Sequence, residues 1–358
     1  MKKFLLLSVC AIGMAAVAGC SNGEKATEES KAEGNYTIDI VAKGFQHQFW
    51  KSVESGAKDA AQEYGATINF VGPANETAIQ EQVQMLNNAV NKKPDAIVLA
   101  SLDTESQVDL LKQAQSEGIP IIGFDSGVPG APEGSIVGNA STDNENAASV
   151  GADKLFEQLA DEVKNAKVGS AVRIGVVSQE VNSQSITDRT SGFIEQFAKL
   201  SEEQGATVSI VGHSKFANKV AEKDASVILD LQVPAQITDA AAQTAAQTLL
   251  NKTDIIGIFG TNEFAAKGII NANNAVGKPV GDKIVGAGFD SGTLQKDAVS
   301  SKVFIGSVTQ DPVQIGFKAV ELAVKAIKGE SVSDVDTGAV WYDSENIDSD
   351  EVAPLLYD

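Results

Sequence analysis

Short apolar, β-branched runs alternate with longer amphipathic stretches along the chain from Tyr36 onward. This alternation is typical of βαβ units, in which helices cover a parallel sheet. Strands are expected at 37–41, 67–71, 96–100, 119–124, 135–137, 172–177, 207–211, 255–259, 283–288 and 303–308. Helices are expected at 49–64, 77–91, 105–117, 144–163, 186–204, 240–250, 264–273 and 313–328. The plan starts again after Thr142, so the pattern predicts two α/β halves.

One pentapeptide, Gly-Phe-Asp-Ser-Gly, occurs at 123–127 and again at 288–292, each time at the end of a predicted strand. In open α/β sheets, ligands bind beyond the carboxyl ends of the strands. We therefore expect Asp125 and Asp290 to face one ligand from opposite sides. The alternative is that strand-to-helix turns favour Gly, Asp and Ser, and that the repeat reflects turn chemistry alone.

The composition excludes several classes of function. The chain has 358 residues, more than one typical domain, and its net charge of −20 would repel a phosphate backbone, so we expect no nucleic-acid partner. Its two cysteines, Cys10 and Cys20, both lie near the N-terminus, and its two histidines are His47 and His213. Thiol chemistry, imidazole metal sites and Ser-His-Asp catalysis are therefore disfavoured, and no cofactor or metal is expected.

The N-terminus has the pattern of a secretory signal, with Lys2 and Lys3 before an apolar run over 4–17 that is too short to span a membrane. Val-Ala-Gly-Cys at 17–20 resembles the lipobox of bacterial lipoproteins. We expect a signal peptide over 1–19, lipidation of Cys20 and a polar tether over 20–34. The mature protein would then be anchored to the outer face of the cytoplasmic membrane. The alternative is a plain signal peptide with a chance cysteine.

Several short motifs follow one another in a set order: Phe-Trp at 49–50, Ile-Pro-Ile-Ile at 119–122, Asp-Arg at 188–189, Gly-Thr-Asn-Glu at 260–263, Gly-Phe-Asp at 288–290 and Gln-Asp-Pro at 310–312. In this order they resemble the ribose-type periplasmic sugar-binding proteins, the solute receptors of bacterial ABC importers, over residues 35–358. The resemblance implies two Rossmann-like, doubly wound parallel-sheet domains, the type I periplasmic binding protein fold. It places the lobes at 35–139 plus 311–338 and at 140–310 plus 339–358, with hinge crossings near 139–142, 308–311 and 337–340.

The resemblance also implies ligand-binding roles. Phe49 and Trp50 would stack on the apolar face of a sugar, because ring faces suit its C–H surface. Asp125 and Asp290 would accept hydrogen bonds from sugar hydroxyls, and charged acceptors make these bonds stronger. Arg189, one of only two arginines, would offer a planar fork of donors.

Three further candidates accompany these. Asp188 would orient Arg189 or reach the ligand itself. Asn262 and Gln310 match amide ligands of the family, since one amide group both donates and accepts.

Some positions depart from the ribose pattern. Lys43 stands where ribose receptors carry a small hydroxyl residue, and a lysine there resembles the receptors for the furanosyl signal autoinducer-2. His47 would either bind the ligand or cap a helix. The second-lobe aromatic of the family would fall near Gln236, where no aromatic residue stands, so stacking is expected from one lobe only and Gln236 itself is expected to contact the ligand. The chain is also longer between 214 and 232, where it adds a β-branched stretch at 226–231.

These features predict a binding protein rather than an enzyme. The alternative is a glycosidase, in which two facing carboxyl groups act as acid and nucleophile on a glycosidic bond. The expected ligand is a monosaccharide such as a pentose, a hexose or a related polyol, and the expected partners are the permease subunits of an ABC transporter. Reception of autoinducer-2, or signalling to a chemoreceptor or sensor kinase, is the alternative. We expect a monomer, because the lobes must open and close.

Overall fold

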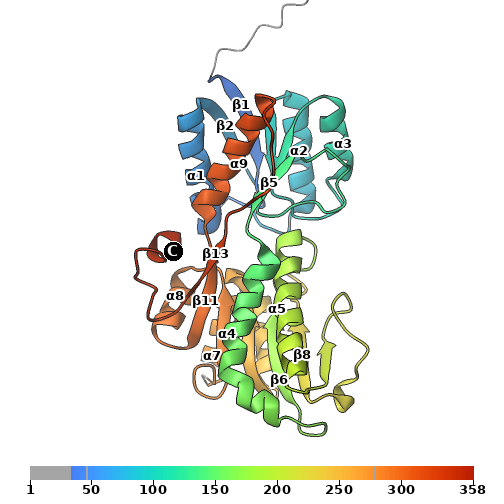
Figure 1. Cartoon of the computed structure of the whole chain (residues 1–358), viewed down its shortest axis with the longest axis vertical. Helices are drawn as coiled ribbons and strands as arrows, with labels where there is room; N and C mark the ends of the chain where they lie inside the picture. Colours follow the sequence, from blue (N-terminus) through green and yellow to red (C-terminus); the bar gives the residue numbers. More distant parts are fainter. Residues whose placement is uncertain (1–33, 46, 278) are drawn as a thin grey trace, which may run out of the picture. The chain divides into compact units, whose positions relative to one another are not determined.

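The computed structural model of the chain describes residues 34–45, 47–277 and 279–358. One body, the first lobe, is built on a six-stranded parallel sheet with strand order β12-β5-β4-β3-β1-β2. Its strands are β1 (Tyr36–Val41), β2 (Ala66–Val71), β3 (Ala96–Leu99), β4 (Ile121–Phe124), β5 (Gly138–Ser141) and β12 (Val335–Asp336). Helices α1 (Gln48–Tyr64) and α9 (Pro312–Ile327) cover one face, and α2 (Ile79–Lys92) and α3 (Val108–Ser116) cover the other, as Figure 1 shows.

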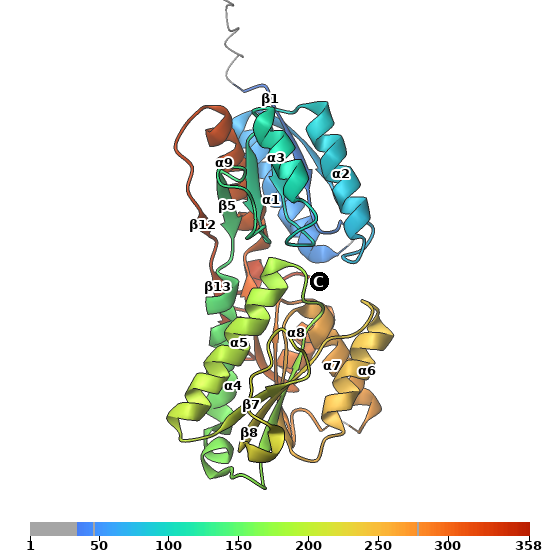
Figure 2. The same ribbon diagram turned by 90° about the vertical axis from the view of Figure 1, so that its right-hand side faces the viewer.

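A second body, the second lobe, has a seven-stranded sheet with strand order β13-β11-β10-β9-β6-β8-β7, parallel except for β13. Its strands are β6 (Val172–Val177), β7 (Val208–Val211), β8 (Val227–Gln232), β9 (Ile255–Gly260), β10 (Val285–Phe289), β11 (Phe304–Gln310) and β13 (Ala339–Tyr342). Helices α4 (Asn144–Asn165) and α5 (Gln184–Glu203) pack on one face. The other face is covered by α6 (Asp239–Leu250), α7 (Glu263–Ala275) and α8 (Thr293–Ser300), seen in Figure 2.

The sequence explains why both sheets are buried on two sides. Strand β3 reads Ala-Ile-Val-Leu and all four residues are buried, which is what a parallel sheet with helices on both faces requires. In the first lobe, α1 and α9 approach closely through two glycines. A Cβ atom on Gly56 would lie 1.9 Å from the Val313 carbonyl oxygen, and one on Gly316 would lie 1.9 Å from that of Val53. Glycine is therefore required at both positions.

The chain crosses between the lobes three times in the part that the structure describes: from β5 to α4, from β11 to α9, and from β12 to β13. The fold class predicted from the sequence, two parallel-sheet α/β domains of the type I periplasmic binding protein fold, is confirmed.

Some local predictions were wrong or incomplete. The strand expected at 135–137 starts instead at Gly138 and reads Gly-Asn-Ala-Ser, which has little β-propensity, so its pairing with β4 and β12 imposes it. Helix α8 and strands β12 and β13 were not predicted. The β-branched stretch at 226–231 lies almost wholly in β8, which pairs with β6 and β7.

The segment before β8 is tied to the sheet by Arg173, which is 5% exposed. Its guanidinium contacts the carboxylates of Asp230 and Glu222, each at 2.7 Å, and of Asp254 at 3.0 Å. Glu222 belongs to a short 3-10 helix, η1 (Glu222–Asp224), in the segment between β7 and β8. Arg173, the other arginine of the chain, therefore has a structural role.

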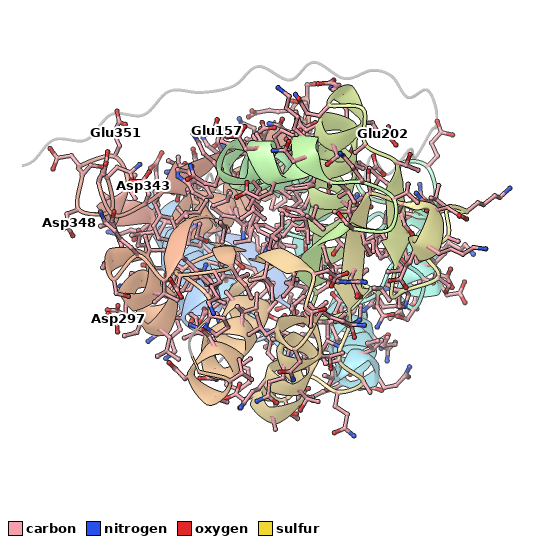
Figure 3. All side chains as sticks on the ribbon, turned by 90° about the horizontal axis from the view of Figure 1, so that it is seen from below. Glu157, Glu202, Asp297, Asp343, Asp348 and Glu351 are labelled. Atoms are coloured by element: carbon pink, nitrogen blue, oxygen red, sulfur yellow. The ribbon has the colours of Figure 1, made fainter. Side chains whose placement is uncertain are left out.

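Acidic side chains project from the periphery of the second lobe, as Figure 3 shows for the six that it labels. Glu157, Glu202 and Asp297 are exposed. The strongly negative net charge of −20 thus resides partly in carboxylates that remain in water. Such a surface favours solubility and carries no information about the ligand.

Candidate functional site

A cavity of about 370 Å³ lies where the carboxyl ends of the strands of both sheets meet. Its volume is within the range of small-molecule sites. Both lobes supply its lining, which consists of Lys43, Gly44, Phe45, His47, Phe49, Trp50, Ala74, Asn75, Glu76, Asp125, Gln179, Ile186, Arg189, Ile237, Asn262, Glu263, Phe264, Asp290, Gln310 and Tyr357.

The two repeated turns place one aspartate each on this cavity. Asp125 follows β4 with a backbone φ of 54°, and Asp290 follows β10 with a φ of 70°. Both residues are therefore in the left-handed region, which aspartate tolerates better than most residues and which is enriched at functional sites. Their side chains are almost fully buried, at 3% and 7% exposure. The pentapeptide thus gives its aspartate the same left-handed backbone conformation in both copies, whereas the final glycine has a positive φ only at Gly292, at 109°.

The first lobe holds a buried ion pair. Lys43, directly after β1, has its Nζ 3.1 Å from Asp125 Oδ2 and donates to Ser185 Oγ at 3.0 Å. Burial disfavours the charged ammonium, but the carboxylates of Asp125 and Glu76 outweigh it and raise the pKa of Lys43. Ser185 lies in the first turn of helix α5 in the second lobe, so Lys43 joins the two lobes at the edge of the cavity.

The second lobe holds the matching acid and base. Arg189 Nη1 lies 3.0 Å from Asp290 Oδ2, and its Nε donates to Asn144 Oδ1 at 2.7 Å. The guanidinium carbon is 4.0 Å from the centre of the Phe289 ring, a cation–π distance. Three fixed contacts therefore orient the arginine on the cavity.

Gln310 completes this group. Its Nε2 donates to Asp290 Oδ1 at 2.8 Å, while its Oε1 is buried without a hydrogen-bond partner among the described residues. Gln310 is 2% exposed and lines the cavity. Buried amide oxygens are rarely left unpaired, so this atom is an acceptor available to a bound molecule.

A chain of hydrogen bonds crosses the cavity from the first lobe to the second. Trp50 Nε1 donates to Glu76 Oε1 at 2.7 Å, and Gln179 Nε2 donates to Glu76 Oε2 at 2.9 Å. Gln179 in turn accepts from Asn262 Nδ2 at 2.6 Å. Burial favours the neutral acid, but the Lys43 charge and the two donated bonds lower the pKa of Glu76. Glu76 is therefore an ionised carboxylate at the boundary between the lobes.

His47 has the helix-capping role that the sequence left open, and it also lines the cavity. Its Nδ1 accepts from the backbone N–H of Phe49 at 3.2 Å at the start of α1. Its Nε2 lies 2.8 Å from Glu263 Oε2 in the second lobe. Although burial opposes the charge, the bond to Glu263 raises the pKa of His47.

Aromatic rings reach the cavity from both lobes. Phe49 and Trp50 come from α1 and lie edge to face with ring centres 5.0 Å apart. Stacking residues were expected on one lobe only, and Phe264 of α7 and Tyr357 also line the cavity. Neither stands near the position where the family aromatic was expected, so no local motif pointed to them.

Two predicted site residues are not on this cavity. Gln236 is exposed, and its neighbour Ile237 lines the cavity instead. Asp188 lies one residue before Arg189 on α5, so its side chain leaves the helix in a different direction, toward Glu145 and Gln184. The remaining predicted residues, from Lys43 to Gln310, are all brought together.

Sequence reasoning also missed residues of the site. Glu263 stands in the Gly-Thr-Asn-Glu motif directly after the predicted ligand residue Asn262, and this position was the available signal. Glu76 lies outside the motifs that carry the resemblance. Gln179 and Tyr357 had no such signal, because they come to the site only through the arrangement of the lobes.

Asp188 should affect stability in a pH-dependent manner. Burial and the nearby Glu145 carboxylate raise its pKa to about 6, above its value of about 3.9 in an unfolded chain. The folded state therefore binds the carboxyl proton of Asp188 more tightly than the unfolded chain does. This stabilises the folded state below pH 4, and the stabilisation is lost as the pH rises through 6. We expect Asp188→Asn to be more stable than wild type at pH 7.5 by about 1 kcal/mol, allowing for solvent screening.

Urea unfolding at pH 7.5 and pH 4 measures this effect, with Asp109→Asn as the control because that side chain is 96% exposed. An equal gain for Asp188→Asn at both pH values would contradict the prediction.

In the part of the chain that the structure describes, no group of three His, Cys, Asp or Glu side chains is placed to hold a metal ion. Among the same residues, no helix combines the length and apolar character needed to cross a membrane. Cys20 and the predicted signal peptide and tether lie outside the described residues.

Two α/β lobes joined by three crossings, with a cavity between them that is lined by aromatic and charged side chains, define a two-lobed solute-binding protein. The chain matches the family described as "Periplasmic binding protein domain" over residues 38–331 and belongs to it, and the ribose-type group expected from the motifs is confirmed. The protein is therefore a member of an extracytoplasmic solute-binding family.

Three similar proteins illustrate the relationship. A solved structure from Brachyspira murdochii, described as "ABC transporter, LacI family transcriptional regulator", has 38% sequence identity and a TM-score of 0.77, covering 90% of this chain and 99% of that one. A solute-binding protein of an ABC transporter from Agrobacterium vitis, solved with bound D-fucose, has 30% identity and a TM-score of 0.74, covering 90% and 100%. The D-allose-binding periplasmic protein of Escherichia coli is 23% identical over 301 residues, which are 83% of this chain and 86% of that one.

Proposed function

We propose that this protein captures a monosaccharide outside the cytoplasm and presents it to the permease subunits of an ABC importer. The ligand would lie between Asp125 and Asp290, with Phe49 and Trp50 against its apolar face. Lys43, His47, Arg189, Asn262 and Gln310 would contact its polar groups.

The observation that carries the proposal is the set of oriented polar groups around Gln310. Its unpaired buried oxygen, the Asp290 carboxylate and the Arg189 guanidinium stand together on one wall of a cavity of about 370 Å³. A molecule with several neighbouring hydroxyls both donates and accepts, so it can satisfy all three groups at once. Aromatic side chains elsewhere in the lining suit the C–H face of the same molecule.

The relatives support a sugar as the ligand. The Agrobacterium vitis structure contains D-fucose, and the Escherichia coli relative is named for D-allose. We infer that the ligand of the present chain is a hexose or a pentose.

We infer binding rather than catalysis. A glycosidase needs one carboxylic acid to give up a proton and another carboxylate to act as base or nucleophile. Here each of the two repeated aspartates is in an ion pair with a base, Asp125 with Lys43 and Asp290 with Arg189. Burial raises the pKa of Asp125, but the positive charges of Lys43 and Arg189 oppose this shift, so the pairing favours a carboxylate that acts as a hydrogen-bond acceptor.

We propose that ligand binding closes two lobes, 35–139 plus 311–338 and 140–310 plus 339–358, about the three crossings, and that the protein acts as a monomer. The contacts Lys43–Ser185, Glu76–Gln179 and His47–Glu263 each join one lobe to the other beside the cavity. They would form on closure and break on opening.

We further propose that Cys20 carries a lipid anchor after removal of residues 1–19, which keeps the receptor beside its transporter. The support is the lipobox-like sequence and the polar stretch over 20–34. In a membrane fractionation of expressing cells, Cys20→Ala should move the protein from the membrane to the soluble fraction, and retention at the membrane would contradict the anchor.

A thermal-shift screen with D-ribose, D-allose, D-fucose and autoinducer-2 tests the function directly. A ligand at a hundredfold excess over its Kd adds about 2.7 kcal/mol to the free energy of unfolding, so a true ligand should raise Tm measurably. Arg189→Ala should abolish that rise. If no member of the panel stabilises the wild type, or if the rise persists in Arg189→Ala, the proposed function or its site is wrong.

A further inference from the structure

The segment after β13 returns to the ligand cavity. It packs on the second lobe, where Val352 is 2% exposed inside an apolar cluster of that lobe and Ile347 and Leu356 pack against the same cluster. Figure 1 marks the end of the chain beside the region where the two lobes meet. The next residue after Leu356, Tyr357, is 8% exposed and lines the cavity.

The backbone of Tyr357 is attached to the second lobe next to Asp290. Its N–H donates to Ser291 Oγ at 3.0 Å, and its carbonyl oxygen accepts from the Gly292 N–H at 3.1 Å. Ser291 and Gly292 belong to the repeated pentapeptide. The position of Tyr357 is therefore determined by the same turn that positions Asp290.

The ring of Tyr357 packs against the first lobe, although its phenol oxygen also accepts from the Ser291 N–H of the second lobe at 3.5 Å. It lies edge to face with the Phe49 ring and with the His47 ring, each at 6.0 Å between centres. It belongs to the apolar cluster of the first lobe that also contains Trp50. One residue thus has its backbone bonded to one lobe and its side chain packed on the other, at the wall of the cavity.

We propose that Tyr357 is an affinity-determining residue of this site, contributed by the segment that follows β13. Its ring forms the cavity wall together with Phe49 and stabilises the closed arrangement by joining the lobes. Burial, with the carboxylates of Asp290 and Glu263 nearby, raises its pKa well above the usual value, so the phenol remains neutral. The inference rests on the proposed function, since it concerns the same ligand site.

Calorimetry tests it with the sugar of the panel that the wild type binds most tightly. Tyr357→Ala should raise Kd about tenfold to a hundredfold, because two aromatic contacts between the lobes are lost, and stopped-flow measurement should locate the change in the dissociation rate. Tyr357→Phe keeps the ring and should bind within about threefold of wild type. Glu351→Gln, an exposed side chain in the same segment and outside the cavity lining, should bind as wild type does.

A spectroscopic measurement separates ligand contact from a purely structural role. The chain has four tyrosines, so fluorotyrosine labelling gives a simple ¹⁹F spectrum in which Tyr357→Phe identifies one resonance by its loss. Adding the same sugar should shift that resonance more than those of Tyr36 and Tyr64, which do not line the cavity.

The outcomes distinguish the two proposals. If Tyr357→Ala binds within twofold of wild type, or the Tyr357 resonance does not respond to the sugar, this inference is overturned while the function stands. If the wild-type protein binds no sugar of the panel, both the proposed function and this inference fail.

Discussion

Asp290→Asn should weaken sugar binding about a hundredfold or more while the protein remains folded. Asn tolerates the left-handed backbone that Asp290 adopts at a φ of 70°, so the turn should persist. The substitution removes the charge that orients Arg189 and replaces one acceptor oxygen with a donor. A hydrogen bond to a charged group contributes about 1.5–3 kcal/mol, and here both the ligand bond and the position of Arg189 are affected.

Calorimetry on Asp290→Asn measures the loss, with Asp297→Asn as the matched control. Asp297 is an exposed acid of the same lobe, on α8, so its substitution should leave Kd unchanged (Figure 3). If Asp290→Asn binds the sugar with wild-type affinity, Asp290 is not part of the ligand site.

Lys43→Met should both destabilise the fold and abolish sugar binding. Lys43 and Asp125 are 5% and 2% exposed at their side chains, and removing the base leaves a buried carboxylate without its cation. Breaking a buried pair in this way costs about 3–5 kcal/mol, which urea unfolding would detect. Lys58→Met is the control, since its exposed pair with Glu54 contributes only about 0.3–0.5 kcal/mol.

The double variant Lys43→Met with Asp125→Asn separates stability from binding. Because both charges are removed together, most of the lost stability should return, whereas sugar binding should not. If the double variant binds sugar as the wild type does, the pair serves the fold alone and is not part of the ligand site.

The sequence predicted most of the fold because parallel sheets covered by helices leave a strong local pattern. Strand β6 was predicted with its observed bounds, and α1 ends at Tyr64 as expected, with Gly65 in the left-handed conformation at a φ of 66°. Strand β5 was misplaced because Gly-Asn-Ala-Ser carries no β pattern and becomes a strand only by pairing with β4 and β12.

The candidate site was predictable where its residues stand in turns and motifs. Asp125 and Asp290 were found through the repeated pentapeptide, and both line the cavity. Asp188 shows the limit of this approach, since adjacent residues on a helix point in different directions, and only Arg189 faces the cavity.

From its sequence alone, this protein was determined to be a two-lobed α/β binding protein with an acidic turn in each half. Periodicity and turn chemistry are local properties, so they can be read from neighbouring residues. Only the tertiary structure decided that Gln179 meets Glu76 and that the ring of Tyr357 packs on Phe49. These pairs are separated by more than a hundred residues, and their contact depends on how two independently packed lobes meet, which no local pattern encodes.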